Sequence, residues 1–277
     1  MISQIKKSIK KITYRHSKFK AERSDSIKLF WWNEKENVGD ALNFNIANWL
    51  SGDKVIEWVP HNYKGNFITS VGSVAQLANE YTTIWGSGLI SKDAVPFKKP
   101  KHVLAVRGPL TRDRLNSLGI DCPRIYGDPA LLLPNLITGG TERKKYKLGI
   151  IPHFVDKENP FFKQDLPDWI KVIDVETVDV KKFINEILEC EKIVSSSLHG
   201  IILSDAYNVP SSRISFSSLV TGGDFKFADY SFSVGRNNFT AQKVDVDFPI
   251  VKLLGLNFEL GKFECGDDLL EVNPFEK

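Results

Sequence analysis

The 277-residue chain lacks the patterns that mark several large functional classes. Its three cysteines are odd in number and far apart, which predicts no disulfide framework and no zinc site and favours a reducing compartment. No H-E-x-x-H motif or acidic pair marks a metal site, so we expect no bound metal. No Walker loop is present, no G-x-G-x-x-G follows the first predicted strand, and a G-x-S-x-G elbow is missing. These absences disfavour nucleotide binding and serine hydrolase chemistry.

Long apolar runs are missing too, including the apolar core of a signal peptide near the N-terminus, so we expect a cytoplasmic protein. Residues 1–26 form a basic leader. Residues 1–23 carry eight basic side chains against one acidic one, a balance of +7, while the whole chain carries +3 and the remainder therefore −4. Isoleucines recur every three or four residues in this leader, which fits a basic amphipathic helix at the inner face of an anionic membrane.

The leader has a second interpretation, and one class of partner is not expected for it. A solvated, disordered segment explains the same residues. Nucleic acid is not an expected partner, because the rest of the chain is acidic and carries no recognition motif.

Apolar strands and helical patterns alternate after the leader, which predicts an α/β protein with parallel sheets. The segment Thr138–Lys145 contains only small and charged residues. It is the predicted boundary between a Rossmann-like unit over 27–140 and a second one over 141–247. The tail over 248–277 has a mixed pattern to which we assign no element, and we expect it to pack back on the first unit. The expected strands cover 27–32, 55–59, 67–71, 83–85, 102–106, 147–151, 172–175, 192–194 and 213–216.

A histidine stands where one predicted strand turns into a helix, in the stretch Ser195–Gly200. Strand-to-helix turns lie at the carboxyl end of a parallel sheet, where ligands bind, and the first N–H groups of the helix favour an anion. Serine hydroxyls beside the imidazole of His199 would form a phosphate or carboxylate site capable of proton transfer. An N-cap serine with a histidine satisfied in the core explains the residues equally well.

Other polar motifs also follow predicted strands. The guanidinium of Arg107 suits bidentate binding of a carboxylate or phosphate, although a surface ion pair with Asp113 is the alternative. Asp40 could act as a base toward a sugar hydroxyl or could cap the next helix. Asp128 could face the cleft or belong to a plain turn. The remaining candidates at strand ends are Asn37, Gly39, Gly86, Ser87 and His153.

Six ordered motifs together resemble the polysaccharide pyruvyl transferase family. They are N-V-G-D (37–40), W-G-S-G (85–88), V-R-G-P-L-T (106–111), Y-G-D-P-A-L (126–131), I-I-P-H-F-V-D (150–156) and S-S-L-H-G-I-I-L-S-D-A-Y (196–207). A later segment, Lys226-Phe227 with Asp229-Tyr230 and Gly235, is similar to that family's late motif. The resemblance covers roughly residues 27 to 236.

The resemblance implies a glycosyltransferase-B-like fold, with the active site between two Rossmann-like halves. It implies transfer of pyruvate from phosphoenolpyruvate, as co-substrate and with no other cofactor, to two hydroxyls of a sugar, which forms a cyclic ketal. Its arginine and histidine fall on Arg107 and His199. Where some relatives carry a second arginine before L-H-G, this chain has Ser197, and Lys226 is our candidate for the missing cation.

These arguments give three groups of expected residues. The expected catalytic residues are His199, Arg107 and Asp40. The expected donor-binding residues are Arg107, Ser196, Ser197, His199, Gly200 and Lys226. The expected acceptor-binding residues are Asn37, Gly39, Asp40, Gly86, Ser87, Asp128 and His153.

The expected acceptor is a surface polysaccharide, such as a capsule or exopolysaccharide, or its lipid-linked precursor. A sugar-nucleotide-dependent glycosyltransferase of the same architecture, such as a sialyltransferase, is the alternative enzyme. A non-catalytic carbohydrate-binding protein is the alternative outside enzymes.

Overall fold

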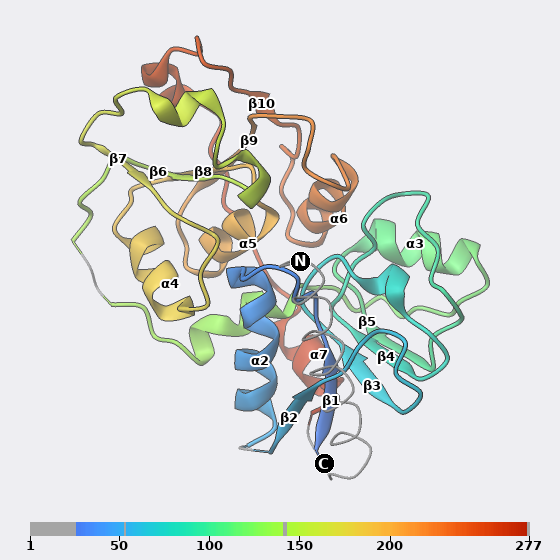
Figure 1. Cartoon of the computed structure of the whole chain (residues 1–277). Coiled ribbons are helices and arrows are strands. Elements are labelled where there is room, and N and C mark those ends of the chain that lie inside the picture. Colours follow the sequence, from blue (N-terminus) through green and yellow to red (C-terminus); the bar gives the residue numbers. More distant parts are fainter. Residues whose placement is uncertain (1–25, 53, 141–142, 276–277) are drawn as a thin grey trace, which may run out of the picture.

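The computed structural model describes residues 26–52, 54–140 and 143–275, and these form two α/β units side by side (Figure 1). The first unit contains a five-stranded sheet in the order β2-β1-β3-β4-β5, and the second contains one in the order β10-β9-β8-β6-β7. Every pairing within these sheets is parallel. The predicted α/β class with two parallel sheets is therefore confirmed, whereas the leader over residues 1–23 lies outside the described residues.

The elements have the following bounds. The first sheet comprises β1 (Ile27–Phe30), β2 (Ile56–Trp58), β3 (Phe67–Thr69), β4 (Thr82–Trp85) and β5 (His102–Ala105). The second comprises β6 (Leu148–Ile151), β7 (Ile170–Val172), β8 (Ile193–Ser195), β9 (Ser211–Ser215) and β10 (Gln242–Lys243). The α-helices are α2 (Val38–Leu50), α3 (Pro109–Ser117), α4 (Val180–Leu188), α5 (Leu198–Ala206), α6 (Phe225–Ser233) and α7 (Gly266–Glu271). The 3₁₀ segments are η1 (Ala75–Leu77), η2 (Pro129–Asn135), η3 (Phe154–Asp156), η4 (Pro160–Lys163) and η5 (Ile250–Gly255).

The two sheets share one strand order. When strands are counted from the start of each unit, both sheets run second, first, third, fourth, fifth. The order therefore reverses between β1 and β3 in the first unit and between β6 and β8 in the second. Ligands of open parallel sheets bind at the carboxyl ends of the strands at such a reversal. Helix α2 follows β1 and helix α5 follows β8, so each helix begins at the carboxyl end of a strand beside one of these reversals.

Two strands begin two residues earlier than predicted, and β10 was not predicted at all. Strand β7 begins at Ile170 rather than at residue 172, and the carbonyl of Val175 accepts the Val38 N–H of α2 at 2.9 Å. Strand β9 begins at Ser211 rather than at Arg213. Ser211 and Ser212 pair with β8 and are buried although they are polar, so their apolar pattern is too weak to reveal the strand.

The two units share a continuous core and exchange elements. The largest cluster of buried apolar side chains includes Leu29 and Trp85 of the first unit with Ile151 and Ile202 of the second. Helix α6 lies between β9 and β10 of the second sheet in sequence but packs against α3 of the first unit. The C-terminal segment returns as well, because Trp85 Nε1 donates to the Leu269 carbonyl at 3.0 Å. In the described ranges, no helix is both long and apolar enough to span a bilayer.

Candidate active site

The first turn of α2 lies at the carboxyl end of β1, and its N–H groups are largely used within the protein. Asn37 caps the helix, since its Oδ1 accepts the Gly39 N–H at 2.8 Å. The Val38 N–H donates to Val175, as described above. This turn is therefore not an anion site, and the capping role considered for Asp40 belongs to Asn37.

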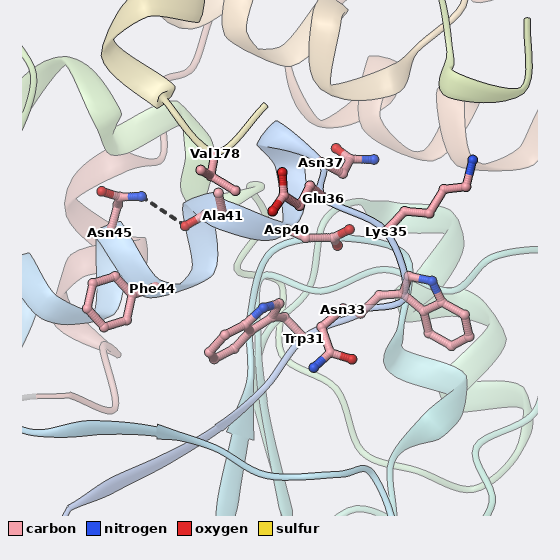
Figure 2. Close-up of a pocket in the computed structure, with 11 residues that line it drawn as sticks. Trp31, Asn33, Lys35, Glu36, Asn37, Asp40, Ala41, Phe44, Asn45 and Val178 are labelled. Carbon is pink, nitrogen blue, oxygen red and sulfur yellow. Dashed lines mark hydrogen bonds between the residues drawn. The ribbon is translucent and has the colours of Figure 1, made fainter. Parts of the chain in front are cut away.

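Asp40 instead faces a pocket of about 430 Å³ beside this turn (Figure 2). Its carboxyl group makes no hydrogen bond with any described residue. Burial raises the pKa of Asp40 to about 7. A carboxyl group with this pKa exchanges a proton easily near neutral pH, which suits the expected role toward a sugar hydroxyl.

The first turn of α5 differs from that of α2 because its N–H groups remain available. Ser197 is the N-cap residue, but its side chain makes no capping hydrogen bond. Ser195 Oγ holds the preceding turn, at 3.0 Å from the Ser197 nitrogen and 2.9 Å from the Ile151 carbonyl. The N–H groups of residues 198–200 find no acceptor in the described parts of the chain. These donors and the Ser197 hydroxyl form a helix terminus of the kind that suits an anion.

Gly200 sits in this turn where the helix meets the sheet. A Cβ at Gly200 would come within 2.3 Å of Ser195 Oγ and 2.9 Å of an Ile151 methyl group. Close packing of α5 on its sheet therefore requires glycine here. Gly200 shapes the turn, and its backbone N–H is the group that it could offer to an anionic substrate.

His199 projects from this turn with one ring nitrogen unused. Its Nε2 is shielded from solvent and has no hydrogen-bond partner among the described residues. On the other side of the ring, a Cβ at Gly39 would lie 2.0 Å from Nδ1, so the imidazole rests directly on α2. Burial lowers the pKa of His199 to about 3, and the positive charges of Lys226 and Arg107 act in the same direction. The alternative of a histidine satisfied in the core therefore does not fit, because Nε2 is unsatisfied.

Lys226 on α6 supplies a cation that is almost fully buried. It is 7% exposed and makes no hydrogen bond or ion pair with any described residue. Its Nζ lies 5.6 Å from the centre of the Phe227 ring. Burial, together with Arg107 and Arg213, lowers the pKa of Lys226 to about 8. A buried ammonium group without a counter-ion costs folding free energy, and an anionic ligand would supply that counter-ion.

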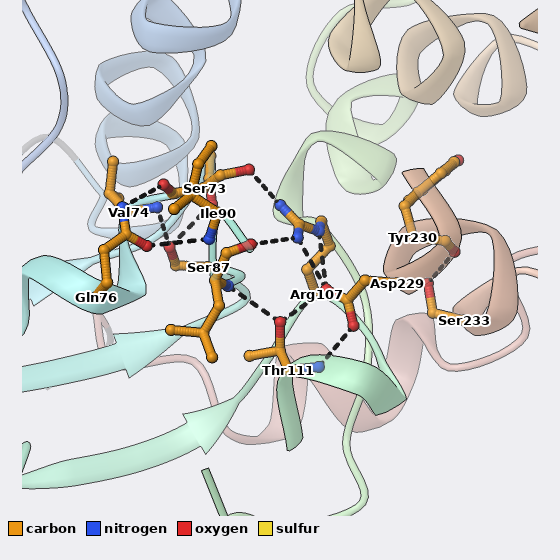
Figure 3. A network of polar contacts seen from close by, with 12 residues as sticks. Ser73, Val74, Gln76, Ser87, Ile90, Arg107, Thr111, Asp229, Tyr230 and Ser233 are labelled. Atoms are coloured by element: carbon orange, nitrogen blue, oxygen red, sulfur yellow. Dashed lines mark hydrogen bonds and ion pairs between the residues drawn. The ribbon is translucent and has the colours of Figure 1, made fainter. Parts of the chain in front are cut away.

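Arg107 lies at the end of β5 and is 0% exposed (Figure 3). Its Nε donates to Asp229 Oδ2 at 3.0 Å, and its Nη2 lies 2.9 Å from the same oxygen. The remaining contacts run from Nη2 to the Leu89 carbonyl at 2.9 Å and from Nη1 to Ser73 Oγ at 2.5 Å. The ion pair considered with Asp113 is not formed. Most of the guanidinium donors are therefore engaged inside the protein, although the positive charge still acts on its neighbours.

Asp229 on α6 connects this network to the start of α3. Its carboxylate accepts the Thr111 N–H and the Thr111 hydroxyl, each at 2.8 Å. A Cβ at Gly108 would lie 1.8 Å from the Asp229 carbonyl oxygen, so the two backbones are in close contact. Helix α6 is thereby fixed on the start of α3, which places Lys226 near Arg107.

His153 follows β6 and belongs to a second polar network. The backbone N–H of His153 donates to Ser196 Oγ, and the Ser196 hydroxyl donates to Asp156 Oδ2, both at 2.8 Å. The hydroxyl of Ser217 also contacts Asp156. Burial and the charge of Lys226 lower the pKa of His153 to about 4. The Ser196 hydroxyl is thus engaged in positioning His153, and of the two neighbouring serines Ser197 has the available hydroxyl.

The turn at residues 127–130 places a carboxyl group behind Arg107. Asp128 Oδ1 accepts the Ala130 N–H at 3.0 Å, while Oδ2 is buried and has no partner in the part of the chain that the structure describes. Burial raises the pKa of Asp128 to about 6, against the opposing effect of Arg107. Gly86 has φ +84° and packs on Pro129.

Ser87 is used within the fold. Its hydroxyl donates to the Gly72 carbonyl at 2.9 Å and so links the ends of β4 and β3. Metal ligands are not assembled either, because the described residues contain no cluster of three histidine, cysteine, aspartate or glutamate side chains suited to an ion.

The predicted residues therefore separate into two regions. His199, Lys226, Arg107 and His153 influence one another electrostatically, and with the first turn of α5 they form what we call the anion cluster. Asp40 and Asn37 face the pocket on another side of α2. Sequence reasoning missed the positioning residues Ser73, Asp156, Asp229 and Ser217. Asp156 and Asp229 lie inside the recognised motifs, but their partners are distant in sequence.

A sequence profile of the polysaccharide pyruvyl transferase family matches residues 37–218. The match spans the start of α2, the end of β5 with Arg107, and the first turn of α5 with His199. The chain belongs to the polysaccharide pyruvyl transferase family. Lys226 and Asp229 lie beyond the matched range, so their place in the site rests on the geometry described above.

Two proteins of known sequence are similar over most of the chain. An uncharacterized protein of Acanthamoeba polyphaga mimivirus is 33% identical over 224 residues, which cover 77% of each chain. The succinoglycan biosynthesis protein ExoV of Rhizobium meliloti strain 1021 is 28% identical over 219 residues, which cover 74% of this chain and 64% of ExoV. A solved structure of an uncharacterized protein from Klebsiella pneumoniae matches with a TM-score of 0.46 and 13% identity, over 87% of this chain and 98% of that chain.

Proposed function

We propose that this family member transfers the pyruvyl group of phosphoenolpyruvate to two hydroxyls of one sugar in a surface polysaccharide or its lipid-linked precursor. One observation carries the proposal: the unpaired ammonium group of Lys226 and the unpartnered His199 Nε2 accompany the free N–H groups of α5. Cations and N–H donors without acceptors suit a small ligand with more than one negative charge.

Phosphoenolpyruvate has this chemistry, since it carries both a phosphate and a carboxylate. The helix terminus and the Ser197 hydroxyl would hold one anionic group, and Lys226 would hold the other. Arg107 contributes its positive charge and the placement of α6, because most of its donors are bound to Asp229, Ser73 and Leu89. Arg107 therefore supports the donor site indirectly in this proposal, whereas its position after a predicted strand favoured a direct contact with the donor.

The reaction needs an acid at the methylene carbon of the donor. In the free protein, burial and neighbouring cations keep the pKa of His199 low, so the ring is neutral. The negative charge of the donor would raise that pKa and favour the imidazolium form. His199 could then protonate the methylene carbon, which makes the adjacent carbon electrophilic.

The atoms balance over two additions. The first sugar hydroxyl attacks the electrophilic carbon, phosphate leaves, and the second hydroxyl attacks the same carbon to close the ketal. One hydroxyl proton ends on the new methyl group by way of His199, and the other leaves with phosphate. Asp40 and Asp128 are the candidate groups that receive these protons, because their pKa values of about 7 and 6 lie near neutrality. No metal or further cofactor enters this scheme.

Two finer expectations remain part of this proposal. The shared strand order of the two sheets supports a glycosyltransferase-B-like arrangement, with the donor on the second unit and the acceptor on the first. The basic leader would bring the enzyme to the inner face of the membrane, where lipid-linked acceptors lie. Cosedimentation of the full chain and of a chain lacking residues 1–23 with anionic liposomes tests the second expectation, since only the full chain should bind.

Calorimetric titration tests the donor. Phosphoenolpyruvate should bind, whereas UDP-glucose and CMP-sialic acid should not. Incubation with a lipid-linked oligosaccharide should then release phosphate in step with a pyruvyl gain on the sugar, read by mass spectrometry. His199→Ala should remove most of this turnover. An acceptor that gains a whole sugar while nucleotide is released would instead establish the glycosyltransferase function, and a protein that binds no donor would be a carbohydrate-binding protein.

A further inference from the structure

The pocket beside α2 has the composition of a carbohydrate site. Its floor is aromatic, since Trp31 and Trp32 follow β1 and Phe44 projects from the second turn of α2. Trp32 is 45% exposed and Phe44 is 46% exposed. Figure 2 shows the rings of Trp31 and Phe44 below the first turn of the helix, with Asp40 and Glu36 above them in the view. Exposed aromatic rings gathered at one concave site indicate a ligand rather than a core.

Polar groups at the edge of this pocket have no partner within the protein. Asn33, Glu36 and Asp40 make no side-chain hydrogen bond with any described residue. Amide and carboxyl oxygens accept hydrogen bonds from hydroxyls, and an amide also donates them. An aromatic floor below such groups matches a pyranose ring, which has one apolar C–H face and equatorial hydroxyls around its edge.

The charge at this pocket selects among sugars. Lys35 is drawn toward the second unit, where its Nζ lies 3.5 Å from Glu176 Oε1 and 5.0 Å from the centre of the Phe154 ring. Glu36 and Asp40 therefore leave the space between the rings and the helix neutral to negative. A uronic acid or an already ketalised sugar would be repelled there.

We propose that this pocket is a subsite for one uncharged pyranose residue of the glycan, stacked on the exposed ring of Trp32 and hydrogen-bonded through Asn33, Glu36 and Asp40. That the glycan is the acceptor of pyruvyl transfer rests on the proposed function, whereas binding of the sugar does not. Asp40 is not among the charges that shift the pKa of His199 or Lys226. Trp32 and Phe44 carry no charge, so their replacement should leave the electrostatic field at the anion cluster, and with it donor binding, unchanged.

Saturation-transfer NMR on the full chain tests the subsite. The probes are the methyl glycosides of glucose, galactose and mannose, with methyl glucuronide as the charged comparison. Trp32→Ala should weaken binding of the preferred neutral glycoside by about tenfold, and Trp32→Phe should retain most of it. Phe44→Ala should weaken it less, because the Phe44 ring lies at the far end of the pocket beyond Trp31 in Figure 2. The matched control is Phe97→Ala, which removes another exposed ring, 63% exposed, in a distant pocket of the first unit.

Phosphoenolpyruvate titration and thermal unfolding of each variant complete the test, and both should match the unmodified chain. The subsite is overturned by any of three results: no neutral glycoside shows a saturation-transfer signal, methyl glucuronide binds best, or Phe97→Ala weakens glycoside binding as much as Trp32→Ala. Glycoside binding that depends on Trp32 without any pyruvyl transfer would refute the proposed function and leave the subsite standing. Pyruvyl transfer with an acceptor KM indifferent to Trp32→Ala would do the reverse.

Discussion

Arg107 and Asp229 form a fully buried ion pair that joins the two α/β units. The Arg107 Nε and Nη2 atoms lie 3.0 and 2.9 Å from Asp229 Oδ2, and both side chains are 0% exposed. The pair connects the end of β5 in the first unit to α6, which lies between β9 and β10 of the second unit. The pair therefore links the two units, and it also holds α6 in the position that brings Lys226 into the anion cluster.

Removal of one partner should be costly. Asp229→Asn keeps the shape of the side chain but leaves the Arg107 charge uncompensated in the interior, which costs about 3–5 kcal/mol. Arg107→Lys loses the planar fork and at least one of its contacts with Asp229, Ser73 and Leu89, so stability and activity should fall together. Urea unfolding measures the change. Asp113→Asn is the matched control, because its carboxylate is 68% exposed beside Arg112 and should contribute under about 1 kcal/mol. Equal losses in the two aspartate variants would contradict the structural role.

The sequence revealed the position of Arg107 but not its partner. Residue patterns placed Arg107 and His199 at strand ends because strand, turn and helix signals are local. Asp229 lies 122 residues away from Arg107, and no periodicity connects the two. The surface pair with Asp113 was considered because only near neighbours are visible in a sequence. A similar limit explains the cap of α2: Asn37 and Asp40 are both good N-cap residues, and the extended backbone of Asn37, with φ −156°, decides between them.

The common strand order of the two sheets could not be predicted either. The alternation of strands and helices predicts parallel sheets, and this was correct. The order of strands depends on which edge each crossover helix joins, and that choice leaves no local signal in the sequence. Ser211 and Ser212 illustrate the same point for a single strand, because their burial comes from pairing with β8 rather than from apolar character.

Lys226 should be dispensable for folding but not for donor binding. Lys226→Met keeps the length of the side chain and removes a buried charge that has no counter-ion, so the free energy of unfolding should be unchanged or higher. Affinity for phosphoenolpyruvate should fall by about 100-fold, since a charge-assisted contact in a buried site is lost. Calorimetry and urea unfolding give the two readouts.

The control for this variant is Lys98→Met, which removes a lysine that is 64% exposed and paired with Glu80. It should change neither readout by much. A large loss of stability with unchanged donor affinity in Lys226→Met would show that Lys226 is structural.

Gly39 should be essential because of the imidazole behind it. A Cβ at this position would lie 2.0 Å from His199 Nδ1, so Gly39→Ala must displace the ring or the helix. A shift of about 1 Å in a reacting group commonly costs about 100-fold in rate, and we expect a loss of that size in kcat. Gly255→Ala is the control, since nothing lies within 4 Å of its added Cβ. Steady-state kinetics at matched unfolding midpoints measure the effect, and a Gly39→Ala enzyme with normal kcat would exclude His199 from proton transfer.

Binding of the donor should draw protons from solution. Burial and mutual repulsion lower the pKa of Lys226 to about 8 and that of His199 to about 3 in the free protein. An anionic donor reverses the repulsion and raises both pKa values, so the bound state holds more protons than the free state. At pH 8 about half of the Lys226 side chains are neutral before binding, which gives an uptake of about half a proton from this residue.

The sign of the pH dependence follows from that uptake. Because the pKa of Lys226 is higher in the complex, the contribution of Lys226 to donor affinity is full below about pH 8 and decreases as the pH rises through and above that value. Calorimetry at pH 8 in two buffers of different ionisation enthalpy counts the protons directly. The uptake that remains in Lys226→Met measures protonation of His199, and its disappearance in a further His199→Asn change would confirm the source. A donor that binds tightly to the unmodified chain with no proton uptake, and with equal affinity at pH 7 and pH 9, would place it away from the anion cluster.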